Sequence, residues 1–305
     1  MTPLRIGTRK SPLTLWQAER VRSLLGERGL AAELVRITTT GDRVLDRPLA
    51  QVGGKGLFVK ELEEALADGR ADLAVHSAKD VPYALPEGFG ICAFLAREDP
   101  RDALVAPRAR RFADLPRGAR VGTSSLRRGM QLLAARPDLV IVPVRGNVQT
   151  RLARAAELDA VVLALAGVRR LGLEDQVTEV LPVELSLPAA GQGAMAIEAR
   201  PGTRGEGASR PLDHADTSRC VRAERVVLAK LLGSCTVPIA AHAVVDGAGL
   251  WLRALVGAPD GSRVVRAERR GSDPETLGAE VAAALLEAGA GPLLEAVRAP
   301  GLSRP

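Results

Sequence analysis

The chain has 305 residues, of which 46% are hydrophobic and 26% are charged, a composition typical of a globular protein with two or three domains. Lys and Arg number 42 against 36 Asp and Glu, which gives a formal charge of +6. No apolar stretch approaches the roughly 20 residues that a membrane helix needs. The first eleven residues also lack the apolar segment of a signal peptide. We therefore expect a cytoplasmic protein that does not bind a membrane.

The cysteines and histidines predict neither disulfides nor a metal site. The three cysteines (Cys92, Cys220, Cys235) are far apart, and the three histidines (His76, His214, His242) do not cluster. Metal sites and disulfide frameworks use closer, repeated spacings.

The first third of the chain alternates between strand and helix patterns. Ser11 and Pro12 suggest a helix N-cap and first turn, and the glycine-bearing segment Thr39–Gly56 suggests a mobile loop. The predicted strands are Leu4–Gly7, Ala32–Thr38, Asp72–His76 and Gly88–Ala96, and the predicted helices are Pro12–Gly29 and Leu57–Ala67. Such alternation is typical of a mostly parallel sheet covered by helices.

The same pattern restarts after an Arg- and Pro-containing boundary at Pro100–Pro116. The predicted strands are Arg120–Gly122, Leu139–Val144 and Ala160–Leu165, and the helices are Ser125–Ala135 and Asn147–Leu158. Two similar α/β units in sequence predict a cleft between them, with ligands bound at the carboxyl ends of strands.

The last third has a different pattern. Ala194–Ala199 is predicted to be a strand that returns to the first unit, Pro201–Pro211 an exposed loop, and Thr217–Leu232 a helix. Asp246-Gly247 and Asp260-Gly261 are hairpin signals between three strands, and two helices follow. We expect domain 1 at 1–97 and 194–212, domain 2 at 98–193, and a small α+β domain at 213–305.

Only five of the 42 basic residues are lysines, and several arginines stand at predicted helix starts. Arg9 and Lys10 precede one helix, Arg127 and Arg128 open another, and Arg145 and Arg151 flank a third. Helix N-termini favour anions, so cations there suggest a polyanionic ligand. The alternative is an excess of surface Arg from GC-rich coding. Nucleic acid is disfavoured, because aromatic residues make up only 2% of the chain and bases stack on aromatic side chains.

Two further residues are candidates for chemistry. Asp80 follows a predicted strand in His76-Ser77-Ala78-Lys79-Asp80-Val81-Pro82 and could act as a general acid or base, or form a structural salt bridge. Cys235 lies in the Gly/Ser loop Leu232–Pro238, where a thiol could be a nucleophile or an attachment point, or be inert.

Taken together, the motifs resemble the hydroxymethylbilane synthase (porphobilinogen deaminase) family. The matching segments, in order, are Arg5–Leu13, Gly54–Glu63, His76–Pro82, Gly122–Arg128, Val144–Val148, Gly191–Gly193 and the Cys235 loop. Ala78 departs from the family, which commonly has Met there, and Gln51 stands where Lys is frequent.

The resemblance implies two α/β domains similar to periplasmic binding proteins and a small third α+β domain. It implies a dipyrromethane cofactor joined to Cys235 by a thioether. The implied reaction condenses four porphobilinogen molecules head to tail onto this primer, with loss of ammonia, and hydrolysis releases hydroxymethylbilane. The expected protein is a monomer that binds neither nucleic acid nor metal.

The resemblance also implies roles for individual residues. Asp80 would be the catalytic carboxylate. The cofactor would be held by Cys235, Lys79, Ser124, Arg127, Arg128, Arg145 and Gly146. The substrate would be held by Arg9, Ser11, Arg151, Arg170, Lys55, Phe58 and Gln192.

Overall fold

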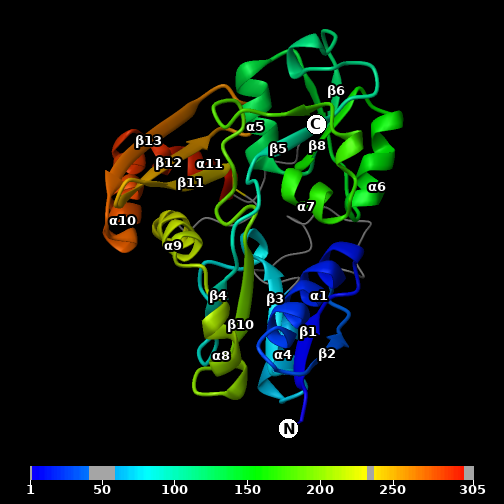
Figure 1. Cartoon of the computed structure of the whole chain (residues 1–305). Coiled ribbons are helices and arrows are strands. Elements are labelled where there is room, and N and C mark those ends of the chain that lie inside the picture. The colour runs from blue at the N-terminus through cyan, green and yellow to red at the C-terminus, as the bar shows by residue number, and fades with distance from the viewer. Residues whose placement is uncertain (1, 41–58, 232–236, 299–305) are drawn as a thin grey trace.

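The computed structural model describes residues 2–40, 59–231 and 237–298. These residues form two five-stranded sheets and one three-stranded sheet. Figure 1 shows the first sheet at the bottom, the second at the top right, and the third sheet beside them on the left.

The first sheet has the strand order β2-β1-β3-β10-β4. β1 runs parallel to β2 and β3, whereas β10 runs antiparallel to β3 and β4. The strands are β1 (Leu4–Thr8), β2 (Ala32–Arg36), β3 (Leu73–Ser77), β4 (Gly90–Phe94) and β10 (Met195–Ala199); the helices are α1 (Pro12–Gly26), α4 (Lys60–Ala67) and α8 (Arg204–Ser209), with 3-10 turns η1 (Ala78–Asp80) and η5 (Arg210–Leu212). α1 packs in one apolar cluster with β1, β3 and β10, and α4 packs in another cluster with Ala74 of β3.

The second sheet repeats this arrangement in the order β7-β6-β8-β5-β9. β6 runs parallel to β7 and β8, and β5 runs antiparallel to β8 and β9. The strands are β5 (Asp102–Val105), β6 (Arg120–Gly122), β7 (Val140–Val142), β8 (Ala160–Ala164) and β9 (Glu179–Val180); the helices are α5 (Leu126–Ala135), α6 (Val148–Ala153) and α7 (Leu165–Arg170), with η2 (Phe112–Asp114), η3 (Arg154–Ala156) and η4 (Glu174–Gln176).

The third sheet is an antiparallel meander of β11 (Ile239–Asp246), β12 (Gly249–Gly257) and β13 (Val264–Gly271). Alternate residues of β12, such as Leu250 and Leu252, are fully buried against α9 (Ala215–Lys230) and α10 (Pro274–Glu287). α11 (Ala290–Arg298) follows them. The α/β fold with two similar sheet-and-helix domains and a small C-terminal domain is as predicted.

Two predicted segments differ from the structure. β5 lies in the segment Pro100–Pro116, for which we predicted a domain boundary. The sequence does not predict this strand, because it has only four residues and the first of them is the charged Asp102. α8 lies in the predicted loop Pro201–Pro211. A Cβ at Gly205 would overlap the carbonyl group of Asp72, so this glycine permits close helix packing and does not mark a loop.

Among the described residues, no single helix is long and apolar enough to cross a membrane. One bent helix pair, Pro274–Glu287 with Ala290–Val297, passes the same length and composition test when the two helices are taken together.

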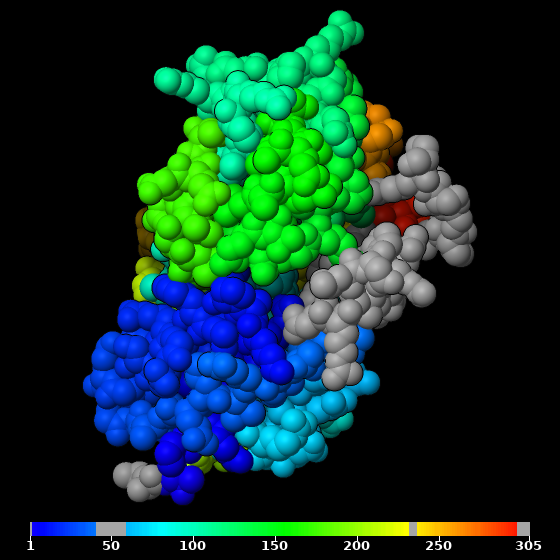
Figure 2. Space-filling model, turned by 90° about the vertical axis from the view of Figure 1, so that its right-hand side faces the viewer, coloured from blue at the N-terminus to red at the C-terminus, as the bar shows by residue number. Residues whose placement is uncertain are grey.

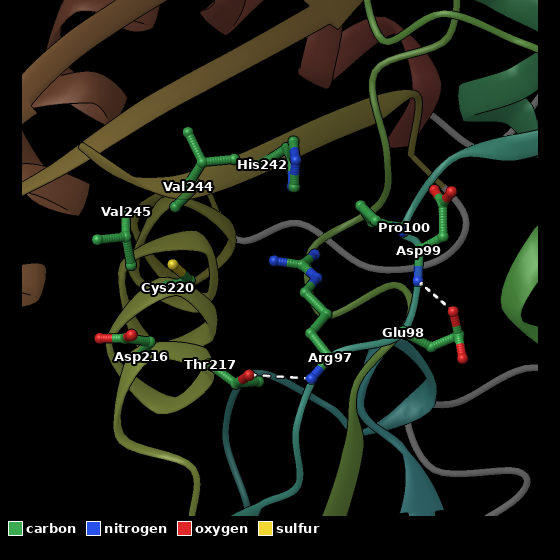
Figure 3. A pocket seen from close by; sticks show the side chains of 11 residues that line it. Arg97, Glu98, Asp99, Pro100, Asp216, Thr217, Cys220, His242, Val244 and Val245 are labelled. Atoms are coloured by element: carbon green, nitrogen blue, oxygen red, sulfur yellow. Dashed lines mark hydrogen bonds between the residues drawn. The ribbon is translucent and has the colours of Figure 1, made fainter. Parts of the chain in front are cut away.

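Two chain crossings join the first two sheets, and one buried carboxylate contacts both. Glu224 of α9 forms an ion pair with Arg97, at 2.6 Å between Oε1 and Nη1, and accepts the backbone N–H of Gly191 at 2.7 Å. Arg97 in turn donates to the backbone carbonyl of Gln192 at 2.8 Å. Arg97 also lines a cavity of about 260 Å³ with Thr217 of α9 (Figure 3). The third domain thus fixes both connections.

Replacement of Glu224 by Gln should lower the free energy of unfolding by about 3–5 kcal/mol, because it leaves a mostly buried guanidinium without its counter-charge. Urea unfolding of Glu224→Gln and of Glu19→Gln, whose pair with Arg22 is exposed, measures the difference. The exposed variant should change stability by less than about 1 kcal/mol. Equal stability of the two variants would contradict the prediction.

Candidate functional site

Positively charged side chains from the first two domains meet where their strands end. Lys79 lies in η1, directly after β3, and Arg128 lies in the first turn of α5. Burial and the charge of Arg128 lower the pKa of Lys79 to about 8. Burial and the charges of Arg128 and Arg145 also lower the pKa of Arg151. We call Lys79, Arg127, Arg128, Arg145 and Arg151 the cation cluster.

The helix starts beside the cluster are capped by their own side chains. Ser125 accepts the backbone N–H of Arg128 at 3.4 Å, and Asn147 accepts that of Thr150 at 2.8 Å. Ser11 caps α1 in the same way. These contacts occupy some of the backbone N–H groups that we expected to bind an anion. The positive charge of the cluster therefore comes mainly from its side chains and less from the helix N-termini.

Asp102 is the buried counter-ion of two members of the cluster. Its carboxylate accepts from Arg127 Nη2 at 2.8 Å and from Arg128 Nη2 at 2.7 Å. It also accepts from Ser186 Oγ at 2.7 Å and Gln192 Nε2 at 2.8 Å. Burial alone would raise the pKa of Asp102, but the two guanidinium groups hold it below its usual range. Asp102 therefore stays ionised.

This contact changes how we interpret three predicted binding residues. Arg127 and Arg128 are only 4% and 5% exposed, and the amide of Gln192 bonds to Asp102 and to the carbonyl of Pro100. Asp102 is not among the site residues predicted from the sequence. The available signal was an acidic residue beside Arg101 at the start of an apolar run.

Asp80 differs from Asp102 in exposure. It is exposed at the end of η1, and its charge raises the pKa of both Lys79 and Arg151, which places it beside the cluster. Gly191 packs directly behind this turn: its φ is +72°, and a Cβ there would lie 3.0 Å from Ala78. His76, the first residue of the motif, is buried, with its Nε2 atom 2.8 Å from Glu198 Oε2.

Ser124 and Gly146 adjoin the cluster. Ser124 donates to the carbonyl of Val144 at 2.8 Å, and Arg151 Nε donates to that of Gly146 at 2.8 Å. Gly146 has a φ of +104°, a backbone conformation that residues with a Cβ rarely adopt, and a Cβ there would lie 2.7 Å from Thr150 Cγ2. Arg9 follows β1 directly.

Arg170 lies between the two α/β domains. Its guanidinium lies 5.7 Å from the ring centre of Trp16 in α1 and donates to the carbonyl of Gly193 at 2.6 Å. Burial lowers its pKa to about 10. Figure 2 shows the blue N-terminal part of the chain directly beneath the green second domain.

Three predicted residues (Cys235, Lys55 and Phe58) lie outside the described residues. The other two cysteines are not suited to an attachment role. Burial raises the pKa of both Cys92 and Cys220 to about 11, which disfavours the reactive thiolate.

The cation cluster fits a ligand with several carboxylates. The cluster has five cations and two neighbouring carboxylates, Asp80 and Asp102, which leaves an excess of positive charge. The Nη1 atom of Arg145 is buried and has no hydrogen-bond partner among the described residues. A buried N–H donor without a partner is costly, and a carboxylate would satisfy this one with a charge-assisted bond. In the described residues, no His, Cys, Asp and Glu groups are arranged to hold a metal ion.

The fold and the cluster define a multi-domain α/β protein with a cationic site where the strands of its first two domains end. Solved structures with similarity include three binding proteins. They are the methionine-binding protein MetQ (15% identity, 68% of this chain and 89% of that chain, TM-score 0.44), a nutrient-binding protein from Burkholderia cenocepacia bound to methionine (15%, 68% and 87%, 0.42), and the alkanesulfonate-binding protein SsuA from Xanthomonas axonopodis pv. citri bound to MOPS (17%, 75% and 74%, 0.35).

Family models identify the chain more specifically. Residues 4–205 match the porphobilinogen deaminase dipyromethane cofactor binding domain, and residues 218–287 match the porphobilinogen deaminase C-terminal domain. The chain belongs to the porphobilinogen deaminase family. It is a transferase with hydroxymethylbilane synthase function in tetrapyrrole biosynthesis, and its cofactor is dipyrromethane.

Lys79 should lose its proton near pH 8 when the cluster is empty of anions, because its pKa is lowered from the ordinary lysine value. Reductive methylation across pH 6–11, read by peptide mass spectrometry on Cys235→Ser protein, measures this midpoint against exposed Lys60. Asp80→Asn should lower the midpoint of Lys79 further, since the charge of Asp80 raises it. Identical midpoints for Lys79 and Lys60 would contradict the prediction.

Proposed function

We propose that Asp80 is the catalytic carboxylate of the hydroxymethylbilane synthase reaction. The supporting observation is the contrast between the two carboxylates whose charges act on Lys79. Asp102 is fully buried and occupied by four side chains, whereas Asp80 is exposed beside the cluster. A fixed carboxylate there can move a proton and stabilise positive charge that develops on the substrate pyrrole as ammonia leaves.

The cation cluster holds the carboxylates of the growing pyrrole chain. Arg145, with its buried unpaired Nη1 atom, and Arg151 and Lys79 make direct contacts, and Ser124 and Gly146 shape the adjoining backbone. Arg127 and Arg128 attract the ligand carboxylates through their charge without contacting them. Asp102 neutralises only one of the two positive charges. Arg9, Ser11, Arg170 and Gln192 hold substrate or the segments beside it.

The dipyrromethane cofactor supplies the pyrrole end to which the first substrate ring is added. Cys235 is its attachment point through a thioether. This assignment rests on the Leu232–Pro238 motif and on the raised pKa values of Cys92 and Cys220. We assign Lys55 and Phe58 to the substrate site from their sequence motif alone.

The substrate is porphobilinogen, and the protein acts as a monomer in the cytoplasm without nucleic acid or membrane. The domain limits are 1–97 with 194–212, 98–193 and 213–305. They are supported by the strands of each sheet, since β10 joins the first sheet after the whole of the second.

Replacement of Cys235 by Ser should remove the covalent dipyrromethane mass from the intact protein, because the hydroxyl is a much weaker nucleophile than a thiolate. Intact-mass spectrometry measures the adduct, with Cys92→Ser as the matched control that keeps it. A full adduct on the Cys235 variant would overturn the attachment site.

Replacement of Asp80 by Asn should leave the fold and the cofactor adduct intact and lower kcat by on the order of 100-fold, because a neutral amide neither transfers the proton nor stabilises the cation. Steady-state assays of porphobilinogen consumption measure the effect. Asp138→Asn is the control, because Asp138 follows the C-terminal end of α5, whereas Arg127 and Arg128 of the cluster lie in the first turn of that helix. Near-normal turnover in Asp80→Asn would favour a purely structural salt bridge.

A further inference from the structure

Helix α9 lies against the turn that carries Asp80. Val221 of α9 is fully buried in the same apolar cluster as Ala78 and Val81, the first residue of η1 and the residue directly after Asp80. Arg225 follows Val221 by four residues, which places both side chains on one face of the helix.

Arg225 bonds to three successive carbonyl groups of the segment that follows Asp80. Its Nη1 atom donates to Val81 at 3.2 Å, and its Nη2 atom donates to Pro82 at 2.6 Å and Tyr83 at 3.2 Å. These carbonyls lie outside any helix or strand, so they depend on such a donor. The rigid fork of a guanidinium can span several acceptors at once, whereas a lysine ammonium acts as a point charge.

The charged groups that act on Arg225 do not compete for these bonds. Burial lowers the pKa of Arg225, and Glu198 of β10 raises it. The carboxylate of Glu198 lies against His76, with 2.8 Å between Oε2 and Nε2. The guanidinium therefore stays charged and directed at the Asp80 segment.

We propose that Arg225 is a positioning residue for the reaction, one that fixes the backbone of the Asp80 turn relative to α9. The proposal rests on the catalytic role proposed for Asp80. α9 ends at Lys230, five residues before Cys235, so the same helix that fixes the turn leads into the segment proposed to carry the cofactor.

A double-mutant cycle between Arg225→Gln and Asp80→Asn, made on holoenzyme, tests whether Arg225 acts through Asp80. We expect Arg225→Gln to lower kcat about tenfold with KM changed less than about twofold, and Asp80→Asn to lower kcat about 100-fold. The double variant should then be no more than about twofold slower than Asp80→Asn alone. Arg225→Lys should fall between wild type and Arg225→Gln.

Two variants of α9 serve as controls. Arg222→Gln removes an exposed arginine of the same helix and should keep wild-type kcat. Val227→Ala, in the core of the third domain, should lower the melting temperature without lowering kcat, which separates destabilisation from positioning. Intact mass establishes that each variant carries dipyrromethane.

Losses that multiply in the double variant would overturn the proposal, as would wild-type kcat in Arg225→Gln. If Arg225→Gln does not fold, Arg225→Lys takes its place in the cycle under the same criteria. Near-normal turnover in Asp80→Asn alone would overturn the role of Asp80 and this proposal with it. That result differs from a failure of the Arg225 proposal alone, in which Asp80→Asn still shows its large loss in kcat.

Discussion

The repulsion between cations held close together is the constraint on which this site depends. Burial is the main cause of the lowered pKa values of Lys79 and Arg151. The charges of Arg127, Arg128 and Arg145 lower these pKa values further, so the five cations of the cluster repel one another. The buried carboxylate of Asp102 partly offsets this repulsion by bonding to two of the five cations. It leaves the rest for a ligand. In the proposed function, the carboxylates of the pyrrole chain offset the remaining repulsion when they bind, which favours acidic pyrroles over neutral compounds of similar shape.

The third domain connects the chemistry to the fold through two adjacent residues of α9. Glu224 bonds to both chain crossings between the α/β domains, and Arg225 bonds to the segment after Asp80. Adjacent helical residues point in different directions, so one short stretch of α9 contacts both places. The position of the turn and the geometry of the crossings are therefore set by a single rigid element.

Local signals in the sequence were enough for much of the fold. Ser11 and Pro12 predict the start of α1, and the glycines at 247 and 261 have the positive φ values that their turns need. The motif around Asp80 was also placed correctly at the end of β3. The partners of Arg127 and Arg128 could not be predicted, because Asp102 and Gln192 reach them from distant parts of the chain. Gly205 misled us for the same reason, since its neighbour Asp72 is 133 residues away in sequence.

The insertion of the second α/β domain between β4 and β10 of the first sheet affects how the protein folds as it is synthesised. Within the described sheets, β4 pairs only with β10, which comes about 100 residues later in the chain. At a synthesis rate of roughly 5–20 residues per second, β4 waits about 5–20 s for its partner. During that time β3 and β4 present unpaired edges, a known route to misassociation. The nascent chain therefore passes through an interval of vulnerability whose length is set by the size of the second domain.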